Sequence, residues 1–190
     1  ERLGRLTGIE VGDMVDILRD CRSARALEIR DRMLTVEVGP RAARLQELMR
    51  GWDGRMDPGL SAPSAYFLAR QEMTRIFARV SGLAGLGAEP CASVAPGIPP
   101  VNQLWWTMPN LLRAGDESLL CGATWDQVIA EALEIAAAVP LVPWGELHRP
   151  VFAHPLAHLA PGRALAPGSA PSGGDGDCVC AVGAYPSGGP

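Results

Sequence analysis

Prolines recur every few residues after residue 139 and divide the chain into two parts that differ in secondary structure. They stand at Pro140, Pro143, Pro150, Pro155, Pro161, Pro167 and Pro171. Because proline lacks a backbone N–H and its ring clashes with the preceding helical turn, this stretch excludes a continuous helix. We therefore expect loop with short extended pieces here, and packed helices before it.

Apolar residues before residue 139 recur at the spacing of one helix face, i, i+3, i+4 and i+7. This spacing predicts helices over residues 11–18, 23–34, 40–49, 62–80, 101–112 and 124–138. Ser23 and Thr124 are good N-cap residues, and Pro40 suits the first turn of a helix. Pro109 interrupts the fifth helix. The first helix carries its apolar face at Val11, Met14, Val15 and Leu18.

A short apolar run follows the proline-rich stretch. Residues 178–182 are preceded by the Gly-, Ser- and Asp-rich residues 172–177, a turn composition, so the run is typical of a β-strand. The residues by themselves therefore predict a mainly helical α+β segment that runs into a Pro/Gly-rich loop and a strand near the C-terminus.

Composition excludes several classes of protein. Apolar residues make up 47% of the 190 residues, but no run approaches the ~20 apolar residues that a membrane span needs. The formal net charge of −4 argues against a dedicated nucleic-acid binder, which needs a basic face. The five cysteines are irregularly spaced and include no C-x-x-C pair, unlike a disulfide framework or a paired-cysteine zinc site.

The three histidines of the chain lie close together. His148, His154 and His158 fall within eleven residues, beside Glu146. Imidazole and carboxylate groups together can bind a metal or transfer protons. Intervening prolines break any helix that would bring them to one face, so ordinary polar contacts are the alternative. A His/Cys metal protein stays open at this point, and elemental analysis for zinc tests it.

The Gly- and Asp-rich turn offers a second candidate site. Residues 173–177 suggest a calcium turn, but the β-helix calcium repeat requires Asp where Cys178 stands. A polar turn before a strand is the alternative. No serine lies in a G-x-S-x-G elbow. The residues by themselves thus identify no catalytic, cofactor-binding or metal-binding residue.

Two stretches resemble motifs of the penicillin acylase (penicillin amidase) family. Residues 144–156, WGELHRPVFAHPL, resemble the family pattern W-G-x-L-H-x-x-x-F-x-H-P-L. Residues 171–179, PSGGDGDCV, resemble the P-x-G-G-D-x-D-x-V turn and strand that follow it in the family. Weaker matches at the first two helices, at the Trp52-Asp53-Gly54 turn and at the helix opened by Thr124 extend the resemblance over nearly the whole chain.

The resemblance implies an N-terminal-nucleophile hydrolase with an αββα sandwich, made as a precursor that cuts itself into an α and a β chain. In such enzymes the new N-terminal Ser of the β chain attacks an amide carbon, with its own α-amine as base. Backbone N–H groups and an Asn amide stabilise the oxyanion. Penicillin-like and other N-acyl amides are the implied substrates.

By motif order, the resemblance places the nucleophile and the oxyanion Asn before Glu1, so this chain is expected to be a fragment from the later part of the β chain. Residues 1–138 then form its helical portion, and residues 139–190 the return loop and the start of the sheet, within a single incomplete domain. No catalytic residue carries over. The calcium that the family often binds is expected upstream, and His148 and His154 take structural roles.

The resemblance also sets expectations for partners and location. The partners are the α chain, the remaining β-chain segments and a small-molecule amide substrate, with no nucleic acid and no membrane. The location is periplasmic or extracellular. The chain alone is expected to hydrolyse nothing. The alternative is a stand-alone helical interaction or scaffold module, which predicts a cooperative thermal melt.

Overall fold

The computed structural model describes residues 3–5, 7–83, 102–150 and 168–180, together with Leu156, Leu159 and Ala164. The described helices are η1 (Leu3–Arg5), α1 (Val11–Leu18), α2 (Ala24–Met33), α3 (Pro40–Arg50), α4 (Ala62–Val80), α5 (Asn102–Ala114), η3 (Ser118–Leu120), α6 (Trp125–Ala136) and α7 (Trp144–Leu147). Within this part of the chain the fold is mainly helical. None of the described helices is both long and apolar enough to cross a membrane.

All six helices that the apolar spacing predicts are present, and local signals set where they begin. The Ser23 hydroxyl accepts a hydrogen bond from the backbone N–H of Ala26 at 3.1 Å and caps α2. Thr124 and Gln127 cap α6 reciprocally, at 3.2 and 2.9 Å. Pro40 occupies the first turn of α3. Pro109 does not end α5, which continues to Ala114.

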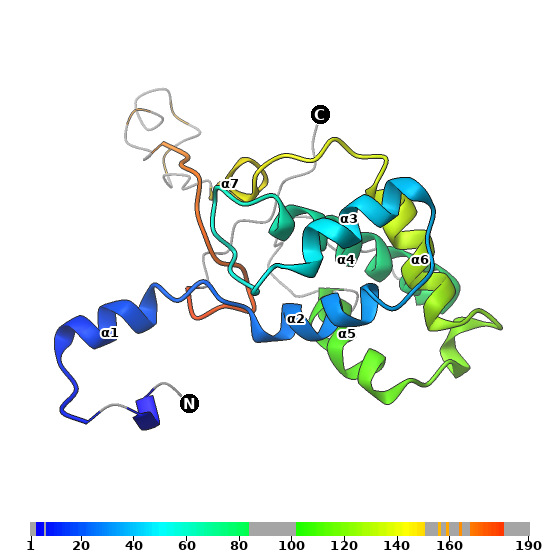
Figure 1. Ribbon diagram of the computed structural model, residues 1–190. Coiled ribbons are helices and arrows are strands. Elements are labelled where there is room, and N and C mark those ends of the chain that lie inside the picture. Colours follow the sequence, from blue (N-terminus) through cyan, green and yellow to red (C-terminus); the bar gives the residue numbers. More distant parts are fainter. Residues whose placement is uncertain are drawn as a thin grey trace.

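Helix α4 forms the centre of the helical body (Figure 1). It packs most extensively against α6 and also contacts α2, α3, α5 and α7. Phe77 of α4 stacks on Trp125 of α6, with ring centroids 5.5 Å apart and planes 2° from parallel. Because α4 has neighbours on several sides, it is buried almost all round, and polar residues on it must find internal partners.

The predicted strand over residues 178–182 is wrong at its described residues. Cys178–Cys180 form bends, and Ala181 and Val182 lie outside the described residues. The backbone N–H of Cys178 donates to the Asp175 carbonyl at 3.2 Å and closes a turn, while that of Cys180 donates to the Asp20 carbonyl at 3.0 Å. A strand needs a continuous ladder, and the only pairing in the described part of the chain is an isolated bridge between Arg22 and Arg55.

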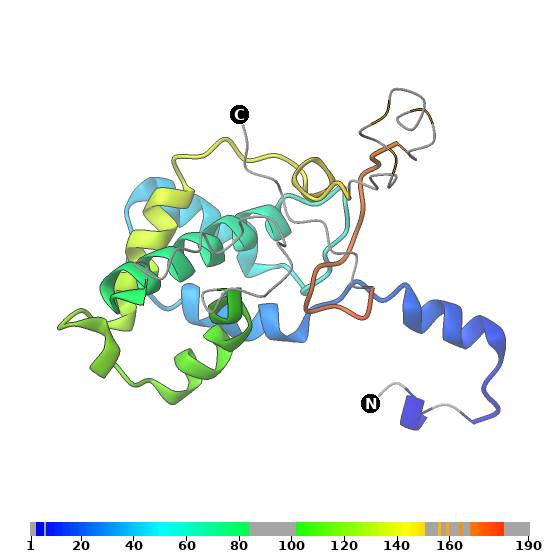
Figure 2. The same ribbon diagram turned by 180° about the vertical axis from the view of Figure 1, so that it is seen from behind.

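The segment over residues 168–180 runs along the helical body to the junction between α1 and α2 (Figures 1 and 2). The N–H of Gly174 donates to the Met56 carbonyl at 2.9 Å, and that of Ser172 donates to the His148 carbonyl at 3.1 Å. The segment is therefore hydrogen-bonded to three separate parts of the chain, near residues 20, 56 and 148.

Candidate functional site

The most deeply buried charges of the described residues meet at Arg70, in the middle of α4. The side chains of Arg70 and Asp177 are 0% and 1% exposed, and Arg70 Nη1 lies 2.5 Å from Asp177 Oδ2. Nη1 also donates to the Tyr66 hydroxyl at 2.8 Å. The guanidinium lies over the ring of Trp105, 3.9 Å from its centroid. Arg70 thus joins α4, α5 and the Gly/Asp-rich turn in one buried centre.

Helix α5 supplies a backbone acceptor to this centre because of its internal proline. Pro109 has no N–H, so it cannot donate to the carbonyl four residues earlier, which belongs to Trp105. That carbonyl accepts instead from Arg70 Nη2, at 2.6 Å. The proline that interrupts the helix pattern therefore leaves an acceptor where a buried guanidinium needs one.

The surroundings of this centre favour the charged form of Arg70 and disfavour the charged form of Asp175. Burial lowers the pKa of Arg70, but Tyr66, Asp177 and Asp175 together outweigh it and raise the pKa above its ordinary value. Burial raises the pKa of Asp175. Its Oδ1 accepts the N–H of Asp177 at 2.8 Å, whereas Oδ2 has no hydrogen-bond partner among the described residues. Protonation of Asp175 is therefore more favourable in the folded chain than in the unfolded one.

Replacing Asp175 by Asn is expected to raise the free energy of unfolding at pH 7. Stabilisation from a carboxyl with a raised folded-state pKa is present below the ordinary value of 3.8 and is lost as the pH rises through the folded value. The variant's free energy of unfolding therefore exceeds that of the wild-type chain by less and less as the pH falls toward 4. The difference changes by at most about 1.4 kcal/mol per pH unit. Urea unfolding at pH 4 to 7 measures this difference, with exposed Asp16→Asn as the charge control. An advantage independent of pH would contradict it.

The two sequence motifs meet at Trp144. Its indole N–H donates to the Gly174 carbonyl at 3.0 Å, and its ring stacks on His148 at 4.8 Å between centroids. Trp144 is 0% exposed. The neighbouring Gly145 backbone is so close to Pro58 and Pro171 that a Cβ would lie 2.8 and 2.7 Å from them. The structure therefore brings WGELH and PSGGDGD together as one packed junction.

His148 takes a structural position in this junction. It is 2% exposed, and its Nδ1 lies 3.0 Å from the Ser172 carbonyl oxygen. His154 and His158 lie outside the described residues. Within the described ranges no three His, Cys, Asp or Glu side chains are grouped so as to hold a metal ion.

Two buried thiols lie beside the junction. The Cys21 thiol donates to Asp57 Oδ1 at 3.0 Å, and burial together with this carboxylate raises the pKa of Cys21 to about 11. The Cys178 thiol donates to the Cys21 carbonyl at 3.1 Å, and burial raises its pKa as well. Both stay protonated near neutral pH, and a protonated thiol is a poor nucleophile. They are packing residues of the junction.

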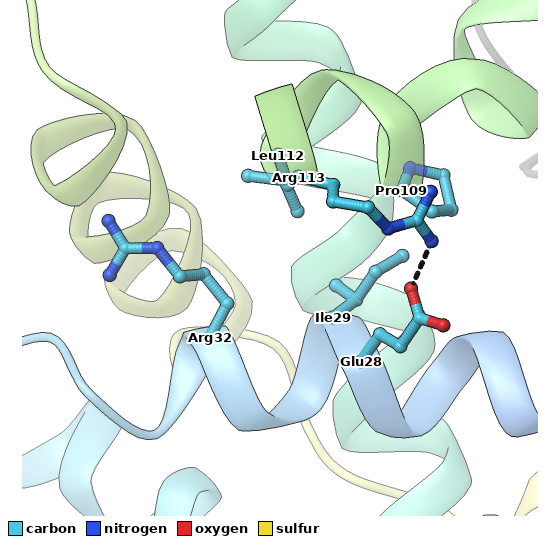
Figure 3. Close-up of a pocket in the computed structure, with 6 residues that line it drawn as sticks. All are labelled: Glu28, Ile29, Arg32, Pro109, Leu112 and Arg113. Atoms are coloured by element: carbon cyan, nitrogen blue, oxygen red, sulfur yellow. Dashed lines mark hydrogen bonds and ion pairs between the residues drawn. The ribbon is translucent and has the colours of Figure 1, made fainter. Parts of the chain in front are cut away.

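A surface pocket lies between α2 and α5 (Figure 3). Its lining consists of Glu28, Ile29, Arg32, Pro109, Leu112 and Arg113. Arg113 pairs with Glu28 at 2.6 Å, and Arg32 pairs with Asp126 at 2.5 Å. The lining offers no Ser, Cys or His, and both arginines are neutralised by carboxylates. The one carboxylate of the lining, Glu28, is paired with Arg113, so the pocket holds no nucleophile beside a general base.

Sequence reasoning missed Arg70, although the pattern held a signal. Arg70 lies four residues after Tyr66 and three before Met73, on the apolar stripe of its helix. A charged residue on a buried stripe needs a partner of opposite charge. The position of Arg70 on the apolar stripe indicates that an acidic partner is present, but it does not identify which carboxylate that partner is.

Comparison with known proteins places this arrangement in context. A family model described as penicillin amidase matches residues 1–188. Penicillin acylase 2 proenzyme from Pseudomonas sp. (strain SE83) is 42% identical over 195 residues, which cover 100% of this chain and 25% of that protein. The chain therefore spans about a quarter of the length of that relative. The match includes both motifs that meet at Trp144.

Proposed function

Because this chain belongs to the penicillin amidase family, we propose that it is the helical section of an amide hydrolase with an αββα fold. The enzyme cleaves a carboxamide side chain of penicillin-like or other N-acyl substrates. The observation that carries the proposal is the match to a penicillin acylase proenzyme over the whole of this chain. The location proposed for the enzyme is periplasmic or extracellular.

The chemistry proposed for the whole enzyme is acyl transfer through an N-terminal Ser that lies outside these 190 residues. The α-amine of that Ser takes its proton as the hydroxyl attacks the amide carbon. Hydrogen-bond donors stabilise the oxyanion, the amine leaves, and water releases the carboxylic acid. The α chain and the remaining β-chain segments of the same precursor are the proposed partners.

The role proposed for this chain is to hold the return segment in place. No catalytic, cofactor-binding or metal-binding residue is assigned to it. The buried pair of Arg70 and Asp177 and the hydrogen bond of Trp144 to Gly174 fasten residues 171–179 to the helices. In the family this turn leads back to the sheet, so its position would set where the following strand begins.

Grafting tests the proposed function. We expect a precursor of the Pseudomonas relative, with its matching quarter replaced by this chain, to be cleaved into two chains and to hydrolyse the side-chain amide of a penicillin. The isolated 190-residue chain is expected to release no product from a chromogenic phenylacetyl amide. The unmodified relative is the positive control. Turnover by the isolated chain, or a folded and cleaved graft without activity, would contradict the proposal.

The alternative is a stand-alone helical interaction or scaffold module. It is favoured by the continuous core that the described helices share around α4. This alternative expects the isolated chain to melt cooperatively as a monomer, and the graft to be neither cleaved nor active. The grafting experiment separates the two functions, because a chain with a continuous core can unfold cooperatively under either of them.

A further inference from the structure

Helix α1 stands apart from the helical body and presents an apolar face to solvent. It projects away from the other helices in both views (Figures 1 and 2), and it packs closely against none of the other described helices. None of its residues is buried. The exposed apolar side chains are Val11 at 83%, Leu18 at 62%, Met14 at 40% and Val15 at 37%, with Ile9 at 51% just before the helix.

These side chains form one continuous face rather than scattered surface residues. Val11, Met14, Val15 and Leu18 follow the i, i+3, i+4, i+7 spacing that aligns side chains along one side of a helix. A contiguous exposed apolar face on a soluble domain marks an interaction surface. A helix of eight residues is also too short to be stable in water by itself. Both points indicate that α1 is completed by a partner.

The net charge of this segment bears on which partner it can take. Between Ile9 and Asp20 the chain carries four carboxylates, at Glu10, Asp13, Asp16 and Asp20, against one arginine, at Arg19. A second copy of α1 would bring like charges together, which costs energy at an interface. An anionic membrane surface would repel the helix for the same reason. The complementary surface is therefore an apolar one that is not itself acidic.

The length of the relative outside the match bears on what this partner is. The relative continues over the three quarters of its length that this chain does not match. We propose that α1 docks its apolar face into an apolar groove on the remaining part of the same precursor. The proposal rests on the proposed function, because it takes the rest of the precursor as the occupant.

Two glutamates on the apolar face test the docking. In the isolated chain, Val11→Glu/Met14→Glu is expected to leave the urea midpoint unchanged, because these side chains are exposed and α1 packs closely against none of the other described helices. In the grafted precursor, the same change is expected to lower the yield of soluble, cleaved protein about tenfold or more, because it puts charge into an apolar contact. Gly12→Glu is the matched control: its position has open space around it, and it lies off the apolar face. It is expected to change neither readout.

Several results would overturn the proposal. A lowered urea midpoint for Val11→Glu/Met14→Glu in the isolated chain would show that the face is already packed within the chain. A concentration-dependent dimer of the wild-type chain that the variant abolishes would assign the face to a second copy, and binding to anionic vesicles would assign it to a membrane. A full yield of cleaved variant graft would show that nothing docks there. An uncleaved, insoluble wild-type graft would count against the proposed function, and the first three measurements still test α1.

Discussion

Arg70→Met is expected to lower the free energy of unfolding by about 3–5 kcal/mol, the cost of taking from a buried carboxylate its buried partner, because Asp177 then keeps, among the described residues, only the exposed Arg25, 3.7 Å away. The pair that it breaks is fully enclosed, with the side chains of Arg70 and Asp177 at 0% and 1% exposure. The Trp105 carbonyl and the Tyr66 hydroxyl also lose a donor. Urea unfolding of the 190-residue chain, followed by tryptophan fluorescence, measures the loss.

Two further variants separate the charge pair from the volume of the side chain. Asp177→Asn keeps the size and removes the charge, so it is expected to destabilise less than Arg70→Met but more than a surface change. Arg70→Met/Asp177→Leu removes both charges together and is expected to recover part of the loss, because no unpaired charge stays buried. The surface control is Arg50→Met, whose exposed pair with Glu47 contributes about 0–1 kcal/mol. A loss from Arg70→Met no larger than the control would refute a stabilising role for the buried pair.

Trp144→Ala is expected to cost about 3–5 kcal/mol, the usual range for removing a large aromatic side chain from a core. The ring is 0% exposed and packs against Phe67, with centroids 5.3 Å apart, and against His148. Its N–H satisfies the Gly174 carbonyl. The variant therefore opens a cavity and frees the turn that carries Asp175 and Asp177.

A graded series distinguishes packing from hydrogen bonding at this position. Trp144→Phe keeps an aromatic ring and loses the N–H, so it is expected to cost less than Trp144→Ala, with about 1–3 kcal/mol of its cost from the unpaired Gly174 carbonyl. Val139→Ala, at a side chain 45% exposed, is the control and is expected to stay within about 0.5 kcal/mol. Equal stability of Trp144→Ala and the control in urea unfolding would show that the junction does not hold the segment.

The helices were predictable because their signals are local. Capping by Ser23 and Thr124 involves residues three positions apart, and an apolar stripe repeats within a few turns. The strand predicted over residues 178–182, which is wrong at its described residues Cys178–Cys180, marks the limit of this reasoning. Its composition favours extended structure, but a strand exists only when a neighbour supplies the ladder, and the backbone at Cys178 pairs with Asp175 in a turn instead.

The resemblance of the two motifs to a family was confirmed, and it identified the segments that matter. It did not show how they are held. His148 and the Gly/Asp-rich turn were weighed as metal sites against structural roles, and the structure places both as packing and hydrogen-bonding groups around Trp144. The sequence also predicted the apolar face of α1. It did not predict that this face is exposed, because the spacing of apolar residues shows which side of a helix is apolar but not what packs against it.

The sequence by itself determined the helices, their caps and the family. It also determined that no continuous helix forms in the proline-rich stretch after residue 139. Each of these depends on residues close together in the chain. Only the tertiary structure decided that Arg70 meets Asp177, which lies 107 residues away, and that Pro109 frees an acceptor for the same guanidinium. Such contacts depend on how α4, α5 and the turn pack together. A buried charge requires a partner, but which of the chain's carboxylates takes that place is decided by the packing alone.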